Sequence, residues 1–363
     1  MKNKLQASTA VVTQFSNWCV PRRGAENPEN QTNAVWSWLI QTRAWPNATH
    51  KVAGAGGKQS PGWCFDRFGQ SKTQLSDGTI IYIGGEHEDH YVPDFFIYND
   101  VVVVRPDSSI EIYGYPIDVF PPTDFHSATQ VGDEIFIIGG LRYPKDRSDK
   151  ETWVYRLQLS DFSIHVVTTH GHPPPWLYDH NAELDKDGQR IICTGGQARH
   201  LPARMTVDNL TTWEFDLKTK TWSALESKPY QRWLLVREDE SNNDLWGIEQ
   251  VAWAIRSSRQ DDFAERYRAK FKERGHVVDA DLFYSRFSPP IPHSIVEPDP
   301  DGDNYGVHRI LIDGVVVRYV EDSFDIAVTV EGELSSDKLE TLKRHSLETY
   351  SKLEGVAYKA IPL

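Results

Sequence analysis

The sequence predicts a mostly β protein in which a repeated four-stranded unit forms a row of sheets, followed by a small α+β domain. Three apolar segments carry this prediction, because each ends in a Gly-Gly pair and the pairs at 84–85, 139–140 and 195–196 recur every 55 or 56 residues. A near-constant period of this size indicates one supersecondary unit copied along the chain. The aromatic content, 12% of 363 residues, suits the core of such β-sheets.

The second and third copies share further features around their glycine pairs. A segment that contains histidine precedes each pair, at 125–128 and 179–182, and a tryptophan follows it, at Trp153 and Trp213. Another aromatic residue comes nine positions later in each copy: Phe162 and Trp222. This order predicts a strand, an apolar strand that ends in Gly-Gly, a long loop, an aromatic strand, a short turn and a fourth strand.

This order of features resembles the kelch repeat of β-propellers, and three copies are recognisable over residues 63–226. The third copy matches best, whereas in the first copy Gly69 stands near the place of the histidine and Val102 near the place of the tryptophan. The resemblance implies an all-β, kelch-type β-propeller with an open number of blades. Propellers close with four to eight blades. Three repeats are too few for a closed ring, so there are two alternatives. Either divergent blades come from residues 1–60 and 227–300, or the array stays open. We expect a closed propeller with strands from both ends.

Most of the repeated residues are expected to be structural. The glycines would end a strand where a side chain would collide with the next blade, or where the backbone needs a positive φ. Trp153 and Trp213 would fill the wedge between blades. His126 and His180 hold equivalent positions, and we expect them to form hydrogen bonds to the backbone that fix blade geometry.

The pattern divides the chain into four parts. They are an N-terminal segment that would complete the propeller (1–62), the kelch-repeat propeller (63–248), a helix with a Pro/Asp-rich linker (249–304) and a small α+β domain (305–363).

The third part is predicted from a change in pattern. Residues 227–248 look like a degenerate hairpin that turns at 242–244. Aromatic residues then recur every fourth position, which predicts a helix over 249–274. The Pro-, Asp- and Gly-rich stretch at 284–306 is typical of a linker or a long loop.

The last part combines strands with one helix. A hairpin is predicted around Asp313-Gly314, followed by a further strand. A helix is expected over 336–354, with Ser336 as its N-cap and Gly355 after its end, and then a final strand.

Charge and composition bear on partners and location. The net charge of −13 makes a nucleic-acid or anionic-membrane partner unlikely. No apolar run approaches the 18 residues of a membrane span, and the N-terminus lacks the apolar core of a signal peptide. The three cysteines, Cys19, Cys64 and Cys193, show no paired spacing, which favours a reducing, cytoplasmic location.

The kelch resemblance implies that the loops after the Gly-Gly strands and between blades gather on one face. We therefore expect a protein-interaction module that binds a protein partner through this face, because arginine and aromatic residues are enriched in such interfaces. We expect no cofactor. The candidate partner-binding residues are Arg142, Tyr143, Lys145, Arg147, Arg199, Arg204, Trp176 and Tyr91.

Two alternatives remain open. Glu86, His87 and His90 in the first post-glycine loop could hold a divalent transition metal, as in a metal-dependent enzyme that resembles the nitrile-specifier proteins. The central channel could instead bind a small ligand or a sugar. The sequence contains no G-x-S-x-G, P-loop or G-x-G-x-x-G motif, so we expect a binding protein rather than an enzyme.

Overall fold

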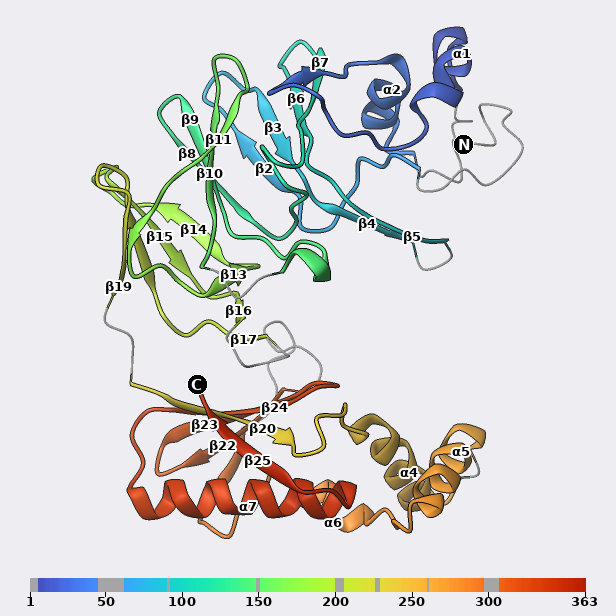
Figure 1. The fold of residues 1–363 in the computed structure, drawn as a ribbon, viewed down its shortest axis with the longest axis vertical. Coiled ribbons are helices and arrows are strands. Elements are labelled where there is room, and N and C mark those ends of the chain that lie inside the picture. The colour runs from blue at the N-terminus through green and yellow to red at the C-terminus, as the bar shows by residue number, and fades with distance from the viewer. Residues whose placement is uncertain are drawn as a thin grey trace. The chain divides into compact units, whose positions relative to one another are not determined.

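A computed structural model gives the arrangement of the chain (Figure 1). It describes residues 6–44, 62–89, 92–147, 151–199, 206–225, 229–259, 261–296 and 307–363. The chain divides into two compact units: residues 1–198 with 208–226, and residues 199–207 with 227–363.

The first unit contains three four-stranded antiparallel meanders that follow one another along the chain, and a short fifth strand extends the first and the third of these sheets (Figure 1). The first sheet contains β2 (Ser71–Gln74), β3 (Ile80–Ile83), β6 (Val101–Val104) and β7 (Ile110–Gly114). The second contains β8 (Ser127–Val131), β9 (Glu134–Ile138), β10 (Val154–Gln158) and β11 (Ile164–Val166). The third contains β14 (Asn181–Leu184), β15 (Arg190–Thr194), β18 (Trp213–Asp216) and β19 (Thr221–Ala224). The prediction of a mostly β chain with antiparallel sheets is confirmed.

Each Gly-Gly pair follows the second strand of its sheet and has positive φ at both residues. In the first two pairs, the second glycine donates its N–H to a carbonyl oxygen in the segment that precedes the next sheet. Gly85 donates to Thr123 at 2.9 Å, and Gly140 donates to Leu177 at 3.0 Å. A Cβ on Gly139 would lie only 2.1 Å from the Leu177 carbonyl oxygen. Glycine is therefore required both by the backbone conformation and by the close approach of the neighbouring sheet.

The repeated histidines connect consecutive sheets. His126 Nε2 lies 2.8 Å from Ser71 Oγ of the first sheet, and His180 Nε2 lies 2.9 Å from Ser127 Oγ of the second. Burial lowers the pKa of His126 to about 3 and the pKa of His180 to about 4, because a charged imidazole is poorly solvated there. Both side chains are thus neutral at pH 7, and their hydrogen bonds join one repeat to the next.

The wedge residues differ from the expectation. Trp222 and Phe162 are 1% and 8% exposed, whereas Trp153 and Trp213 are only half-buried. The strands explain this result. Trp222 lies opposite Phe215 in the pair of β18 and β19, with the two ring centres 4.8 Å apart. The aromatic residue of the fourth strand therefore fills the core of the third sheet.

The N-terminal segment adds two helices to the first sheet rather than a further four-stranded unit in the residues described. Helix α1 (Thr9–Trp18) and helix α2 (Ala34–Thr42) pack on the face that carries Val102 and Ile112. Between them, the two-residue strand β1 (Glu29–Asn30) pairs with β7 at the edge of the sheet. The expected contribution of a strand from this end is thus limited to β1.

Short strands complete the first unit. A hairpin of β4 (Glu86–Asp89) and β5 (Val92–Ile97) follows the first Gly-Gly pair (Figure 1). Strand β12 (His170–Gly171) runs parallel to β19. Strands β13 (Trp176–Tyr178), β16 (Gln197–Arg199) and β17 (Val207–Asp208) form a three-stranded sheet, and the division between the two units falls inside β16 and inside β17. A 3-10 turn, η1 (Pro144–Asp146), follows β9.

The second unit contains one six-stranded sheet with the strand order β21-β22-β23-β24-β20-β25. Its strands are β20 (Gln231–Arg237), β21 (Ser294–Val296), β22 (Val307–Ile312), β23 (Val315–Glu321), β24 (Ile326–Glu331) and β25 (Tyr358–Pro362). Its helices are α4 (Leu245–Ser257), α5 (Asp262–Glu273), α6 (Ala280–Ser285) and α7 (Ser336–Glu354). Figure 1 shows α7 along the sheet.

These elements correct the boundaries expected at 248 and 304. Strand β20 pairs with β24 and β25 and so belongs to the second unit, not to the repeats. The residues after 242–244 form α4 instead of a hairpin strand, because Leu245, Ile248 and Ala252 bury one helical face. The helix expected over 249–274 is divided, since Ser258 takes a left-handed conformation that ends α4.

The stretch interpreted as a linker is folded up to residue 296. Phe283 and Ile291 are buried in the main core of the unit, and β21 pairs with β22. The terminal pattern is confirmed in its main elements, with the hairpin at Asp313-Gly314 and the helix that ends before Gly355. The N-cap is Ser335 rather than Ser336, a shift of one residue.

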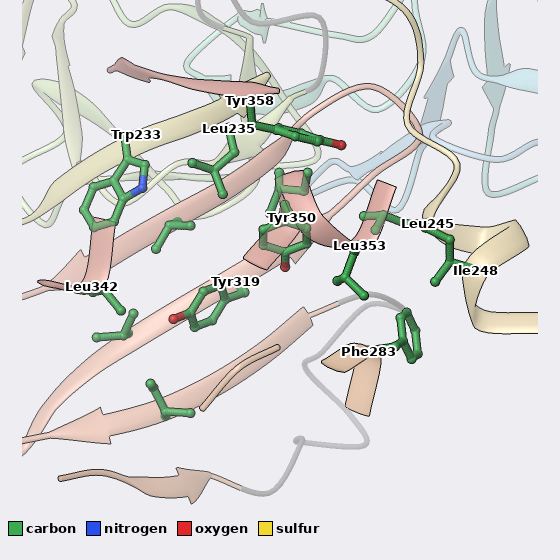
Figure 2. Packing of buried hydrophobic residues seen from close by; sticks show 14 of the residues in the cluster. Trp233, Leu235, Leu245, Ile248, Phe283, Tyr319, Leu342, Tyr350, Leu353 and Tyr358 are labelled. Carbon is green, nitrogen blue, oxygen red and sulfur yellow. The ribbon is translucent and has the colours of Figure 1, made fainter. Parts of the chain in front are cut away.

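The core of the second unit lies between the sheet and its helices (Figure 2). Trp233 and Leu235 from β20 face Leu342 and Tyr350 from α7, and α4 adds Ile248 at one end.

None of the helices described in the chain is long and apolar enough to cross a membrane.

Candidate functional site

The loop after β9 packs against the hairpin of β4 and β5. The Tyr143 hydroxyl accepts a hydrogen bond from the Ile97 N–H at 2.8 Å, and its ring meets Phe95 edge-on with the ring centres 5.6 Å apart. Lys145 is exposed, and its Nζ lies 6.0 Å from the centre of the Tyr143 ring. Tyr143 thus fixes the loop to the hairpin and leaves Lys145 in solvent.

Arg147 holds the shape of the same loop. Its Nε donates to the carbonyl oxygens of Leu141 and Arg142, both at 3.1 Å, and the side chain is half-buried. Hydrogen bonds from one guanidinium to two consecutive carbonyls close the loop on itself. Arg147 therefore contributes to the surface and also to the loop's conformation.

Arg142 and Trp176 are buried, which corrects their assignment to a partner-binding surface. Arg142 is 6% exposed, and its guanidinium carbon lies between 5.3 and 5.7 Å from the ring centres of Trp153, Tyr155 and Trp176. Trp176 is 4% exposed and donates its indole N–H to the Gly140 carbonyl at 2.7 Å. A residue that follows a Gly-Gly pair need not point to solvent, because the Arg142 side chain packs among three aromatic rings.

A buried carboxylate lies below this loop. Burial raises the pKa of Asp124, while the Arg142 main-chain N–H, at 2.7 Å from Asp124 Oδ1, and the neighbouring Glu86 lower it again. Glu86 is half-buried and lies at the start of β4, where its backbone also bridges Phe68. This glutamate therefore faces the interior rather than an exposed acidic loop.

The expected metal ligands do not form a cluster in the described residues. His87 is 5% exposed and lies opposite Phe96 in the hairpin. Neighbouring residues of a strand point to opposite faces, so Glu86 and His87 diverge. Throughout the described ranges, no group of three or more His, Cys, Asp or Glu side chains could hold a metal ion. His90 lies outside the described residues.

Three of the expected partner-binding residues remain: Tyr91, Arg199 and Arg204. Tyr91 and Arg204 lie outside the residues that the structure describes. Arg199 ends β16 and belongs to the second unit; it is half-buried, and its buried Nε has no hydrogen-bond partner among the described residues.

Two exposed phenylalanines were missed by the sequence analysis. Phe68 is 60% exposed and its backbone bridges Glu86, and Phe95 is 40% exposed on the partner strand β5. We define the hairpin surface as Phe68, Phe95, Tyr143 and Lys145. No periodicity could reveal the two phenylalanines, because they lie outside the repeated positions and most phenylalanines of this chain are core residues.

The second unit contains a pocket of about 810 Å³ that the sequence analysis also missed. Helices α4 and α6 form one side, and strands β21, β22 and the end of β23 form the other. Its aromatic lining residues are Trp246, Phe283, Tyr284 and Phe287, and its charged ones are Glu249, Arg286, Arg309, Glu321 and Asp322. The lining residues lie in four stretches of sequence: 243–249, 283–296, 307–310 and 321–323. The second of these stretches overlaps the segment that was interpreted as a linker.

An ion pair organises the wall of this pocket. Arg286 donates from Nε and Nη2 to the two oxygens of Glu321, at 2.7 and 2.9 Å, and the Tyr350 hydroxyl donates to Glu321 Oε1 at 2.7 Å. Beside it, the His308 ring stacks on Phe287 with 4.0 Å between ring centres. Burial lowers the pKa of His308, so its ring is neutral at pH 7.

Comparisons with known proteins add little to this geometry. No protein-family model matches the chain, and no curated protein matches it. Among solved structures, a partial similarity is to a novel fungal alcohol oxidase of the AA5 family in complex with copper, at 17% sequence identity and a TM-score of 0.28. The match covers 45% of this chain and 44% of that one, so the chain spans less than half of that structure. A similarity at this level carries no argument about fold or activity.

Proposed function

We propose that residues 63–226 are kelch-type propeller repeats and that the chain is a protein-interaction module, which binds a protein partner through the hairpin surface. Two observations carry this proposal: the exposed ring of Phe95 lies beside Tyr143 and Lys145, and the exposed Phe68 is joined to the same hairpin by its backbone bridge to Glu86.

The repeat geometry supports the kelch assignment. Three four-stranded meanders, glycine pairs with positive φ after each second strand, and histidines that link consecutive sheets recur at the same positions. Such units bury their faces against neighbours of the same kind. We also propose that the blades close into a ring, and we leave the number of blades open.

The composition of the hairpin surface supports binding. Interfaces are enriched in aromatic residues, and an aromatic anchor contributes most when its strand is already ordered. Phe95 lies on a paired strand, and Tyr143 is fixed to the same strand by its hydrogen bond with Ile97. Lys145 adds a positive charge at the rim, which favours an acidic group on the partner.

The cysteines fit a cytoplasmic setting for this interaction. Cys19, Cys64 and Cys193 are all buried free thiols. Burial raises the pKa of the Cys193 thiol to about 12, so it is protonated and unreactive at neutral pH.

Photo-crosslinking tests the proposal at single residues. A benzophenone amino acid replaces Phe68 or Phe95 in the full chain, in the native cells, and the products are identified by mass spectrometry. Val166, which is 56% exposed on β11, is the matched control position. We expect positions 68 and 95 to capture the same protein and position 166 to capture none of it. Equal capture at all three positions, or different proteins at 68 and 95, would contradict the proposed surface.

A further inference from the structure

We propose that the pocket of the second unit binds a small organic cation, in which an ammonium group is attached to an aromatic or aliphatic body. This site is separate from the hairpin surface of the proposed function and does not depend on it.

The size and the walls of the pocket suit a small molecule. A volume of about 810 Å³ lies within the range of roughly 300–1,000 Å³ that small-molecule sites occupy. Trp246 is 49% exposed and Tyr284 is 39% exposed although both line a concave site. Aromatic surface left in contact with solvent inside a pocket is available to cover the apolar body of a ligand.

Trp246 forms the part of the wall that a cation would contact, and Glu249, which already interacts electrostatically with Arg286, adds negative charge beside it. They lie three residues apart on α4, which places them on the same helix face, and both line the pocket. Edge-to-face contacts with Phe263 and Tyr267, at 5.8 and 5.4 Å between ring centres, orient the indole. In the described part of the chain, no Lys or Arg lies over the Trp246 ring.

Other rings of the same wall already contact cations. The Arg286 guanidinium carbon lies 3.9 Å from the centre of Phe283 and 4.2 Å from that of Phe287, and Arg256 lies 4.3 Å above Tyr284. Tryptophan has the strongest attraction for cations among the aromatic residues. The indole of Trp246 therefore offers the ring face on which a ligand cation gains most.

The charges of the lining favour a cation over an anion. Three carboxylates, Glu249, Glu321 and Asp322, accompany the two arginines, Arg286 and Arg309. Both oxygens of Glu321 accept hydrogen bonds from Arg286, so an anionic ligand would have to compete with a buried partner for this guanidinium. The neutral ring of His308 adds no positive charge at pH 7.

Calorimetric titration of the full chain tests the charge preference. The probe is phenyltrimethylammonium, and benzoate and benzyl alcohol are its anionic and neutral counterparts of similar size. We expect the cation to bind at least about tenfold more tightly than either counterpart, which is a difference of about 1.4 kcal/mol. Benzoate binding as tightly as the cation, or no binding of the cation at millimolar concentration, would overturn the proposal.

Substitutions on α4 locate the site. We expect Trp246→Ala and Glu249→Gln each to weaken binding of phenyltrimethylammonium by about tenfold. Trp253→Ala is the matched control, because Trp253 lies on the same helix, is 41% exposed and does not line the pocket. Equal loss in Trp246→Ala and Trp253→Ala would show that the helix, and not the pocket, determines binding. Circular dichroism of each variant checks that α4 is intact.

Discussion

The two units bury their apolar residues in different ways. In the first unit, separate clusters lie within and between successive sheets, and the same glycine and histidine contacts recur at each junction. In the second unit, one cluster of 21 buried residues connects all four helices to a single sheet. The repeats of the first unit expose loops at equivalent positions, whereas in the second unit α4 and α6 line a pocket together with strands of the single sheet. This difference in architecture is the basis on which we propose a protein-binding surface in the first unit and a small-molecule site in the second.

Removal of the most deeply buried repeat aromatic is expected to have the largest effect. Trp222→Ala would leave a cavity beside Phe215 in the third sheet and destabilise the first unit by about 3–5 kcal/mol. Trp213→Ala is the matched control, because Trp213 is half-buried in the same sheet and should cost less. Chemical denaturation measures both, and an equal cost for the two variants would contradict the burial argument.

Acid is expected to weaken the first unit through its histidines. The folded pKa values of His126 and His180, about 3 and about 4, lie below the ordinary value of 6.5. The unfolded chain therefore binds more protons between pH 6.5 and pH 4, and stability falls as the pH falls through this window. At pH 5 the loss is about 2 kcal/mol for each histidine.

Replacement of both histidines by glutamine tests this linkage. The variant should lose most of the pH dependence of the first unit's free energy of unfolding between pH 6.5 and pH 4. An unchanged pH dependence would show that other groups cause it. His165→Gln is the control, since His165 is exposed on β11.

The junctions between sheets can be tested with alanine in place of glycine. Gly139→Ala combines a positive φ of 70° with a collision at the Leu177 carbonyl, so we expect a cost of about 2–4 kcal/mol. Gly195→Ala has a similar φ of 62° but meets nothing within 4 Å, so it should cost about 1 kcal/mol. Thermal unfolding of the two variants compares a glycine at a junction between sheets with one whose added Cβ meets no neighbouring atom, and equal shifts would contradict the role of the junction.

Much of the first unit could be predicted from the sequence because its contacts repeat. The Gly-Gly period located β3, β9 and β15. The repeated histidines were expected to bind the backbone, but they bind serine side chains of the preceding sheet instead. Burial of Arg142 could not be predicted, since it depends on three aromatic rings: Trp153, which precedes β10, Tyr155 in β10 and Trp176 in β13.

The second unit was harder to predict because its pairs are distant in sequence. Trp233 of β20 lies opposite Pro362 of β25, and no local pattern indicates that register. The pocket lining likewise combines Trp246, Phe287 and Glu321 from three separate segments. Proline and aspartate near residue 290 suggested a linker, although the buried Phe283 and Ile291 fix that segment to the core.

Partner capture by matched variants tests the central claim most directly, namely that the hairpin surface of the first unit binds the partner. The protein crosslinked at positions 68 and 95 is incubated with purified Phe68→Ser/Phe95→Ser, Val166→Ser and Trp246→Ala forms of the full chain, and dissociation constants are measured. The account predicts a loss of at least about tenfold for the double variant and unchanged affinity for the other two. Unchanged affinity of the double variant, or a loss confined to Trp246→Ala, would contradict it.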